Sequence, residues 1–214
     1  ESAIVLGIYL VDYLDEMNSG AADDAIDELL GILAAYDRPV YLRFGYEFDG
    51  NWNRYEPEAF KAAWRYFHQR MVAAEVNNVA LVWQSATYCS GRYTGAPLDA
   101  WYPGDEVVDW VGLSWFTQNE DCALAPLEEM LAFAREHNKP LMIAEAAPQR
   151  FAIENLTYSG SGRSFENVMA DQIWGDWYEP FFTLIDENKD VIRAVAYINT
   201  HWDAQQMCGE PYRY

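Results

Sequence analysis

The sequence predicts an α/β fold of the (β/α)8 TIM-barrel type that is incomplete in this chain, with about six strand–helix units. The strand-like segments are continuous apolar runs, which is typical of parallel strands buried on both faces. Amphipathic helical segments alternate with these runs, a pattern that favours a parallel sheet covered by helices. Polar and aromatic residues follow every strand, as on the active face of a barrel. A dinucleotide-binding sheet would show a glycine fingerprint after its first strand, but Gly7 stands alone here.

Six apolar runs predict the strands. They cover residues 3–10, 40–44, 79–84, 107–115, 141–146 and 192–199. Turns that contain Pro39 and Pro140 precede the second and the fifth run. A complete barrel has eight strands and about 250 residues, so we interpret residues 1–214 as a single partial barrel domain that lacks the first two strand–helix units. An unclosed barrel exposes two strand edges, which predicts self-association, partner chains or further residues.

Amphipathic segments predict the helices. They cover residues 21–35, 57–75, 127–137, 165–173 and 181–188. We expect Asn18 or Ser19 to cap the first helix, because a side-chain oxygen there can accept a bond from a free backbone N–H group. Pro57 suits the first turn of the second helix, where its missing N–H group costs nothing.

The composition excludes several classes of partner. The chain has 14 Lys and Arg against 34 Asp and Glu, and its net charge of −20 disfavours nucleic acid and anionic membranes as partners. It contains no run of about 18 apolar residues that could span a bilayer. The sequence begins at Glu1 without a signal peptide, so we interpret it as a processed protein or a fragment. We expect a secreted or periplasmic location.

The cysteines and histidines give little sign of metal chemistry. Cys89, Cys122 and Cys208 allow three single disulfide pairings, and three free buried cysteines are the alternative. A bridge would fit an extracytoplasmic setting. The three histidines are far apart in sequence and show no metal-binding spacing, so we predict no metal.

Two glutamates, Glu47 and Glu145, stand where an apolar strand gives way to a polar, aromatic-rich loop. Two carboxylates that face each other across a barrel mouth can share the acid and nucleophile roles of glycoside cleavage. The alternative is that both are ordinary strand-end residues in salt bridges. Side chains alternate along a strand, so we expect Arg43 to share a side with Glu47, and Ile143 with Glu145.

Arg43 has two possible roles at this position. It could be the cation that keeps one carboxylate ionised while the other becomes a proton donor, or it could orient Glu47. The alternative is a core-facing charge paired with another acid, such as Asp12.

Aromatic residues make up 16% of the chain, and many fall in the predicted loops after strands. Flat rings there can stack on sugar faces, although each ring taken alone could also anchor a loop or pack in the core. The strand ends Gln84 and Ser114 are candidate sugar contacts by position. Other predicted substrate-binding residues are Arg43, Tyr46, Trp52, Trp83, Trp115 and Trp202.

Three segments resemble glycoside hydrolase family 26, the mannanase and lichenase group. They are Arg43-Phe-Gly-Tyr-Glu47-Phe-Asp-Gly-Asn-Trp52-Asn, Tyr102-Pro-Gly-Asp-Glu-Val-Val-Asp109-Trp-Val-Gly112 and Lys139-Pro-Leu-Met-Ile-Ala-Glu145. The resemblance implies an eight-stranded barrel of which this chain holds strands three to eight, with Glu47 as acid/base, Glu145 as nucleophile and no cofactor. The family usually has His directly before its acid/base glutamate, where this chain has Tyr46.

The sequence therefore predicts a retaining endo-β-glycoside hydrolase that cleaves a β-linked polysaccharide of the mannan or β-glucan type. A polysaccharide or oligosaccharide is the expected partner. The alternative is a non-catalytic glycan-binding barrel, or an inactive fragment of such an enzyme. The separation of the two carboxylates distinguishes them, because beyond about 10 Å neither hydrolytic mechanism is accommodated.

Overall fold

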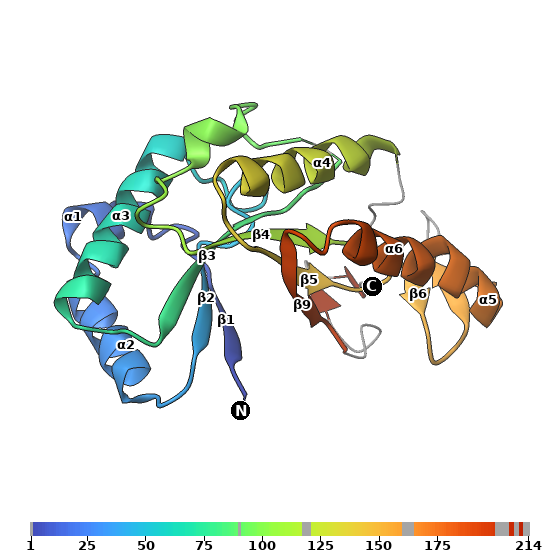
Figure 1. Cartoon of the computed structure of the whole chain (residues 1–214), viewed down its shortest axis with the longest axis horizontal. Coiled ribbons are helices and arrows are strands. Elements are labelled where there is room, and N and C mark those ends of the chain that lie inside the picture. Colours follow the sequence, from blue (N-terminus) through green and yellow to red (C-terminus); the bar gives the residue numbers. More distant parts are fainter. Residues whose placement is uncertain are drawn as a thin grey trace.

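The computed structural model describes residues 2–89, 91–116, 121–159, 165–199, 206–207 and 210–211. Its main feature is a curled sheet of six parallel strands in the order β1-β2-β3-β4-β5-β9. Figure 1 shows helices on the outer side of this curl and β1 and β9 at its two edges. The arrangement is half of a barrel, which confirms the predicted incomplete (β/α)8 type.

All six predicted strands form. Their bounds are β1 (Ile4–Ile8), β2 (Val40–Phe44), β3 (Val79–Ser85), β4 (Trp110–Trp115), β5 (Leu141–Ala146) and β9 (Ile192–Tyr197). They are rich in β-branched and aromatic residues, which suit a pleated surface packed on its faces. The strands at the two edges keep apolar side chains exposed, among them Val5 on β1 and Val195 on β9.

Helices follow most of the strands. They are α1 (Leu14–Ser19), α2 (Asp23–Ala35), α3 (Pro57–Ala73), the 3₁₀ turn η1 (Leu98–Trp101), α4 (Asp121–Glu136), α5 (Ala170–Ile173), the π turn η2 (Trp174–Tyr178) and α6 (Glu179–Glu187). Pro57 begins α3 as predicted. The predicted N-cap of α2 is wrong, because Asn18 and Ser19 belong to α1 and the cap residue Ala22 makes no side-chain bond.

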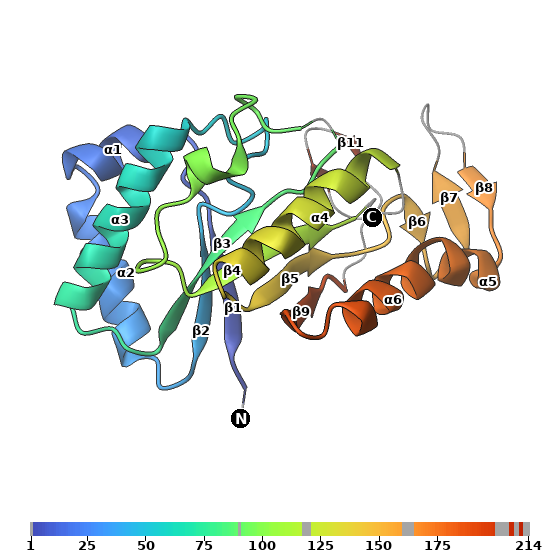
Figure 2. The same ribbon diagram turned by 45° about the horizontal axis from the view of Figure 1, so that its top comes forward.

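Residues 151–167 differ from the prediction. They form a small antiparallel sheet of β6 (Phe151–Ala152), β7 (Thr157–Ser159) and β8 (Phe165–Asn167). The predicted helix over residues 165–173 is therefore wrong in its first half, since only Ala170–Ile173 is helical. Figure 2 shows this sheet beside α5, away from the main sheet. A short hairpin, β10 (Gln206–Met207) with β11 (Glu210–Pro211), follows β9.

The two faces of the main sheet are packed differently. Alternate side chains such as Leu42, Leu81 and Leu113 belong to the large core cluster that the helices also join. The intervening side chains form a smaller cluster on the inner face of the curl, built around Val82 and Met142. The strand pleat thus sorts residues into a helix-facing layer and an inner layer.

Among the helices of the described residues, none is long and apolar enough to cross a membrane.

Candidate active site

Polar residues gather on the inner face of the sheet near the carboxyl ends of the strands. Register pairs Tyr41 with Ala80 and Gln84 with Gly112, so Arg43, Gln84 and Ser114 fall in the same alternating phase. Small neighbours make room for them. Gly7 lies opposite Arg43, and a Cβ atom at Gly7 would come within 2.8 Å of the guanidinium and 2.9 Å of the Tyr46 ring. The lone glycine of β1 therefore has a packing role beside the site.

Glu145 reaches this group through an irregularity in β5. Leu113 pairs with Ile143, but the next residue of β4, Ser114, pairs with Glu145, so Ala144 is an extra residue. Such a bulge changes the direction of the side chains that follow it. The prediction that Glu145 shares a side with Ile143 is wrong. Ile143 packs in the helix-facing core, whereas Glu145 pairs with Ser114 in the inner phase.

Glu47 lies three residues beyond the end of β2, so strand alternation does not set its direction as we predicted. The backbone turns sharply there, since both Gly45 and Glu47 have left-handed φ angles, +59° and +52°. This conformation is unfavourable for a glutamate. Local bonds hold it: the Asn53 side-chain amide donates to the Glu47 carbonyl at 2.7 Å, and the Phe48 N–H group donates to the Gln84 carbonyl at 3.1 Å.

The Glu47 carboxyl is buried and bonded to neutral donors. Glu47 as a whole is 8% exposed. Ser114 Oγ donates to Oε1 at 2.8 Å, and Trp52 Nε1 donates to Oε2 at 3.1 Å. Burial and, secondarily, the charge of Glu145 raise the pKa of Glu47 to about 7, against the lowering effect of the Ser114 and Trp52 bonds; Asp49 adds a smaller raising effect. Glu47 can therefore be protonated near neutral pH.

The Glu145 carboxylate has a cationic partner instead. It forms an ion pair with Arg43, and both side chains are more than four-fifths buried, at 18% and 13% exposure. The same Arg43 nitrogen donates to Gln84 Oε1 at 3.1 Å, and the guanidinium lies 4.6 Å from the centre of the Tyr46 ring. Arg43 thus takes the first predicted role, a cation beside one of the two carboxylates. The alternative pairing with Asp12 is not among its contacts with described residues.

Tyr46 stands where the family pattern usually has histidine, and it packs against Tyr9 with ring centres 4.3 Å apart. Burial, followed by the hydrogen bond with Tyr9, raises the pKa of the Tyr46 hydroxyl, so this residue stays protonated. It lies beside the Arg43 guanidinium and supports it from one side.

The predicted tryptophans fall in different environments. Trp52 is 41% exposed, bonds Glu47 and contacts Tyr88 edge-on at 5.7 Å between ring centres. Trp83 has no exposed surface and stacks on Phe48, and Trp115 is 3% exposed. Both are in the helix-facing phase, which favours the core alternative over sugar contact. Trp202 lies outside the described residues.

The loop after Glu47 is fixed by Asp49, which is buried. Its carboxylate accepts bonds from Ser85 Oγ at 2.6 Å and from the Ala86 N–H group at 2.8 Å, so the loop is tied to the end of β3. Arg92 lies 3.7 Å from the same carboxylate and forms an ion pair with Glu129 on α4. Asp49, Arg92 and Glu129 line a small open pocket beside Trp52.

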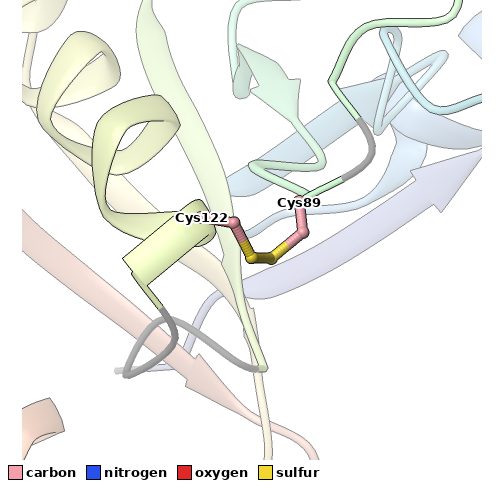
Figure 3. Close-up of a disulfide and its surroundings, with 2 residues drawn as sticks. All are labelled: Cys89 and Cys122. Carbon is pink, nitrogen blue, oxygen red and sulfur yellow. A yellow bond between two sulfur atoms is a disulfide. The ribbon is translucent and has the colours of Figure 1, made fainter.

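A disulfide joins Cys89, in the loop after β3, to Cys122 in the first turn of α4, as Figure 3 shows. This is one of the three pairings that the sequence left open; Cys208 lies outside the described residues. The bridge holds the loop that carries Tyr88 close to the start of α4. Because Tyr88 contacts Trp52, the bridge also supports the Glu47 side of the site.

Within the described residues, no group of three or more His, Cys, Asp or Glu side chains could hold a metal ion. The chemistry that the arrangement allows is acid–base and nucleophilic. It has one carboxyl that can hold a proton near neutral pH and one carboxylate beside a cation, coupled through their charges. Sequence reasoning named Gln84 and Ser114 as candidate sugar contacts and missed that Gln84 bonds Arg43 and that Ser114 bonds Glu47. The alternation phase of β3 and β4 was the signal that could have separated them from Trp83 and Trp115.

Comparison with known proteins gives a family match. Residues 11–193 match the profile of Glycosyl hydrolase family 26. Beta-1,3-xylanase TXYA of Vibrio sp. is 40% identical over 99% of this chain and 46% of its own length. Beta-1,3-xylanase of Alcaligenes sp. is 38% identical over 99% of this chain and 45% of its own. This chain therefore spans less than half the length of these relatives.

Solved structures match at the level of the fold. GH26C from Muricauda sp. is 17% identical, with a TM-score of 0.59 over 84% of this chain and 48% of that chain. The identity is low, so this likeness concerns the fold alone.

Proposed function

The chain belongs to glycosyl hydrolase family 26, and we propose that the protein is a retaining, endo-acting β-glycoside hydrolase. The observation that carries this proposal is the unequal environment of its two glutamates. Glu47 is buried among neutral donors with a pKa of about 7, and Glu145 is paired with Arg43. Retaining glycosidases need this division between a carboxylic acid and a carboxylate.

In the first half of the proposed reaction, Glu47 gives its proton to the glycosidic oxygen of the leaving group. The Glu145 carboxylate attacks the anomeric carbon as the bond to that oxygen breaks, and a covalent glycosyl ester forms. In the second half, the Glu47 carboxylate takes a proton from water, the water oxygen attacks the anomeric carbon, and Glu145 is released. Arg43 orients the Glu145 oxygens and compensates their charge between turnovers.

We propose β-1,3-linked xylan as the substrate. The two relatives near 40% identity are named as β-1,3-xylanases, and they match over almost the whole chain. This support favours xylan over the mannan or β-glucan type that the sequence predicts. Mannan and xylan differ in hydroxyl orientation and in the group at C5, so side chains around the cleft have to discriminate between them.

Sugar contacts are proposed for Trp52, Tyr46 and Arg43, which border the two carboxyl groups, and for Trp202. Trp52 is the best supported, because its ring is 41% exposed beside Glu47. An exposed ring next to the proton donor offers a flat apolar face to the leaving-group sugar. The disulfide is consistent with a secreted or periplasmic location, which we keep as a proposal.

The test is hydrolysis by the complete natural protein of a panel that contains β-1,3-xylan, β-1,4-xylan, mannan and β-1,3-glucan. We expect the highest rate on β-1,3-xylan, with initial products that keep the β configuration when followed by NMR. A variant Glu145→Ala should bind xylo-oligosaccharides without cleaving them. Binding without hydrolysis by the wild type would favour the glycan-binding barrel, and inverted products would exclude the covalent route.

A further inference from the structure

A chain of hydrogen bonds joins the two halves of the site through residues that have no assigned role. Arg43 Nη1 donates to Gln84 Oε1 at 3.1 Å, and Gln84 Nε2 donates to Ser114 Oγ at 3.0 Å. Ser114 Oγ then donates to Glu47 Oε1 at 2.8 Å. Since Arg43 also pairs with Glu145, the chain runs from one carboxyl to the other.

The direction of each bond is set by chemistry. A guanidinium can only donate, so the amide oxygen of Gln84 faces Arg43 and its NH₂ group faces Ser114. The Ser114 oxygen accepts that bond, and its hydroxyl donates to Oε1 of the Glu47 carboxylate. A flipped Gln84 would place its NH₂ group against the Arg43 guanidinium.

Neither linking residue can act on the substrate directly. Gln84 is 1% exposed and Ser114 has no exposed surface. Both are held by the sheet: Ser114 is the register partner of Glu145 across the β5 bulge, and Gln84 lies opposite Gly112. A Cβ atom at Gly112 would approach the Gln84 Cβ to 3.0 Å, so the glycine gives the amide its space.

The two oxygens of Glu47 therefore differ. Oε1 faces the buried Ser114 hydroxyl, whereas Oε2 accepts from Trp52, whose ring is partly exposed. Both oxygens accept a bond, but Oε1 is held against the buried hydroxyl and Oε2 lies on the side of the exposed indole, where a substrate can approach. Two other charged groups act on Glu47, and both raise its pKa: Glu145 from β5 and Asp49 from its own loop.

We propose that Gln84 and Ser114 are positioning residues that fix the orientation of the Glu47 carboxyl, with Oε1 held against the buried hydroxyl and Oε2 turned to the open side of the site. Gln84 acts on Glu47 through Ser114, and it ties this orientation to the Arg43–Glu145 pair. The inference rests on the proposed hydrolase function, in which Glu47 is the proton donor.

The first test is the pH dependence of kcat/KM for the complete protein and its Ser114→Ala variant on β-1,3-xylo-oligosaccharides. The Ser114 bond stabilises the ionised form and lowers the pKa of Glu47, so its removal raises that pKa. The proton donor then stays protonated to higher pH, and the basic limb of the profile moves to higher pH. We expect kcat/KM at the optimum to fall about 10- to 100-fold, because the carboxyl is no longer held in one orientation.

Two further variants separate positioning from general damage. Gln84→Met should move the basic limb in the same direction by less, and in the double variant it should add little to the shift caused by Ser114→Ala. Tyr55→Phe is the control, because it removes another buried hydroxyl, which accepts the Leu10 N–H group at 2.7 Å and does not contact Glu47. The basic limb of the Tyr55→Phe profile should stay at the pH of the wild-type limb.

A carbon-13 NMR titration of the Glu47 carboxyl, assigned with Glu47→Gln, gives a readout that needs no activity. An upward displacement of the Glu47 titration in Ser114→Ala supports the positioning role. Unchanged titration and unchanged limbs in a folded Ser114→Ala variant, or a Gln84→Met shift that adds fully to that of Ser114→Ala, would overturn it. A wild type that cleaves no glycan in the panel contradicts the proposed function instead, so the two failures are distinct.

Discussion

The ends of β2 and β5 each deliver one glutamate to the site, and they do so by different means. Glu145 is still within its strand, turned toward the inner face by the bulge at Ala144 and paired with Arg43. Glu47 lies beyond its strand in a left-handed turn, buried and bonded to a serine and an indole. The same residue type thus meets a cation at one strand end and neutral donors at the other.

The environment of each glutamate, rather than its residue type, distinguishes the two strand ends chemically. Burial without a cation favours the neutral carboxyl at Glu47, and its pKa of about 7 follows. The Arg43 guanidinium beside Glu145 compensates the negative charge of that carboxylate. Four predictions test this division, from the largest expected effect to the smallest.

Replacing the two glutamates should give different kinetic signatures. Glu145→Ala should lower kcat by on the order of 10⁴-fold or more on every substrate, because no nucleophile remains. Glu47→Ala should lower it by about 10²- to 10⁴-fold on polysaccharide. On an aryl glycoside with a good leaving group, Glu47→Ala should retain much more activity in its first step, since little protonation is needed. Steady-state and burst kinetics measure this, and identical profiles for both variants would contradict the division of roles.

Removing the cation should affect the Glu145 end selectively. Arg43→Met breaks a pair that is largely buried, and we expect kcat/KM to fall about 100-fold or more. The kcat/KM of Arg43→Lys should lie between the values of the wild type and of Arg43→Met, because one ammonium group cannot reproduce the planar contacts with both Glu145 and Gln84. Circular dichroism controls for folding. A Lys variant with full activity would show that charge alone is sufficient.

The raised pKa of Glu47 should appear as a cost in stability at higher pH. The folded protein holds this proton up to about pH 7, whereas the ordinary pKa of a free glutamate is 4.5. Between these values the folded state binds more protons than the unfolded state, so stability falls as pH rises. Glu47→Gln should therefore exceed the wild type at pH 8 by about 1–2 kcal/mol in the free energy of unfolding. The difference should disappear near pH 4.5 in urea titrations, and a constant difference would point to another cause.

The smallest effect is expected for the indole bond. Trp52→Phe keeps a ring beside Tyr88 but removes the N–H donor to Glu47 Oε2, a bond that lowers the pKa of Glu47. The basic limb of the pH profile should move to higher pH, with a loss in kcat/KM of about threefold to tenfold. Trp174→Phe, at an exposed tryptophan on η2, is the matched control. A limb that stays in place for Trp52→Phe would mean that the indole does not act on the acid.

Much of the fold followed from the sequence because its strands are strong signals. Each buried apolar run formed a strand near its predicted bounds, since parallel strands covered on both faces need apolar residues throughout. Short elements were missed. Helix α1 has six residues and one buried side chain, Met17, and β6 and β7 have only two and three residues. Segments this short carry no recognisable period.

The candidate site was predicted in its residues more than in its geometry. Glu47 and Glu145 were identified by their place after apolar runs, but a bulge and a left-handed turn direct them, and neither leaves a mark in the sequence pattern. Helix α4 begins at Asp121, six residues before the predicted start at residue 127. The predicted helix starts after Pro126, because proline normally interrupts a helix, whereas α4 continues through it. Its first turn carries Cys122 of the disulfide, a contact set by tertiary structure.

Because β5 contains one extra residue, the number of residues in the strand decides which side chain is presented at the inner face beside Ser114. Without the slip at Ala144, position 145 would continue the phase of Leu141 and Ile143 and meet the helices as a packing residue. When this protein is redesigned or aligned with others, a gap of one residue in that strand therefore matters more than several substitutions along it.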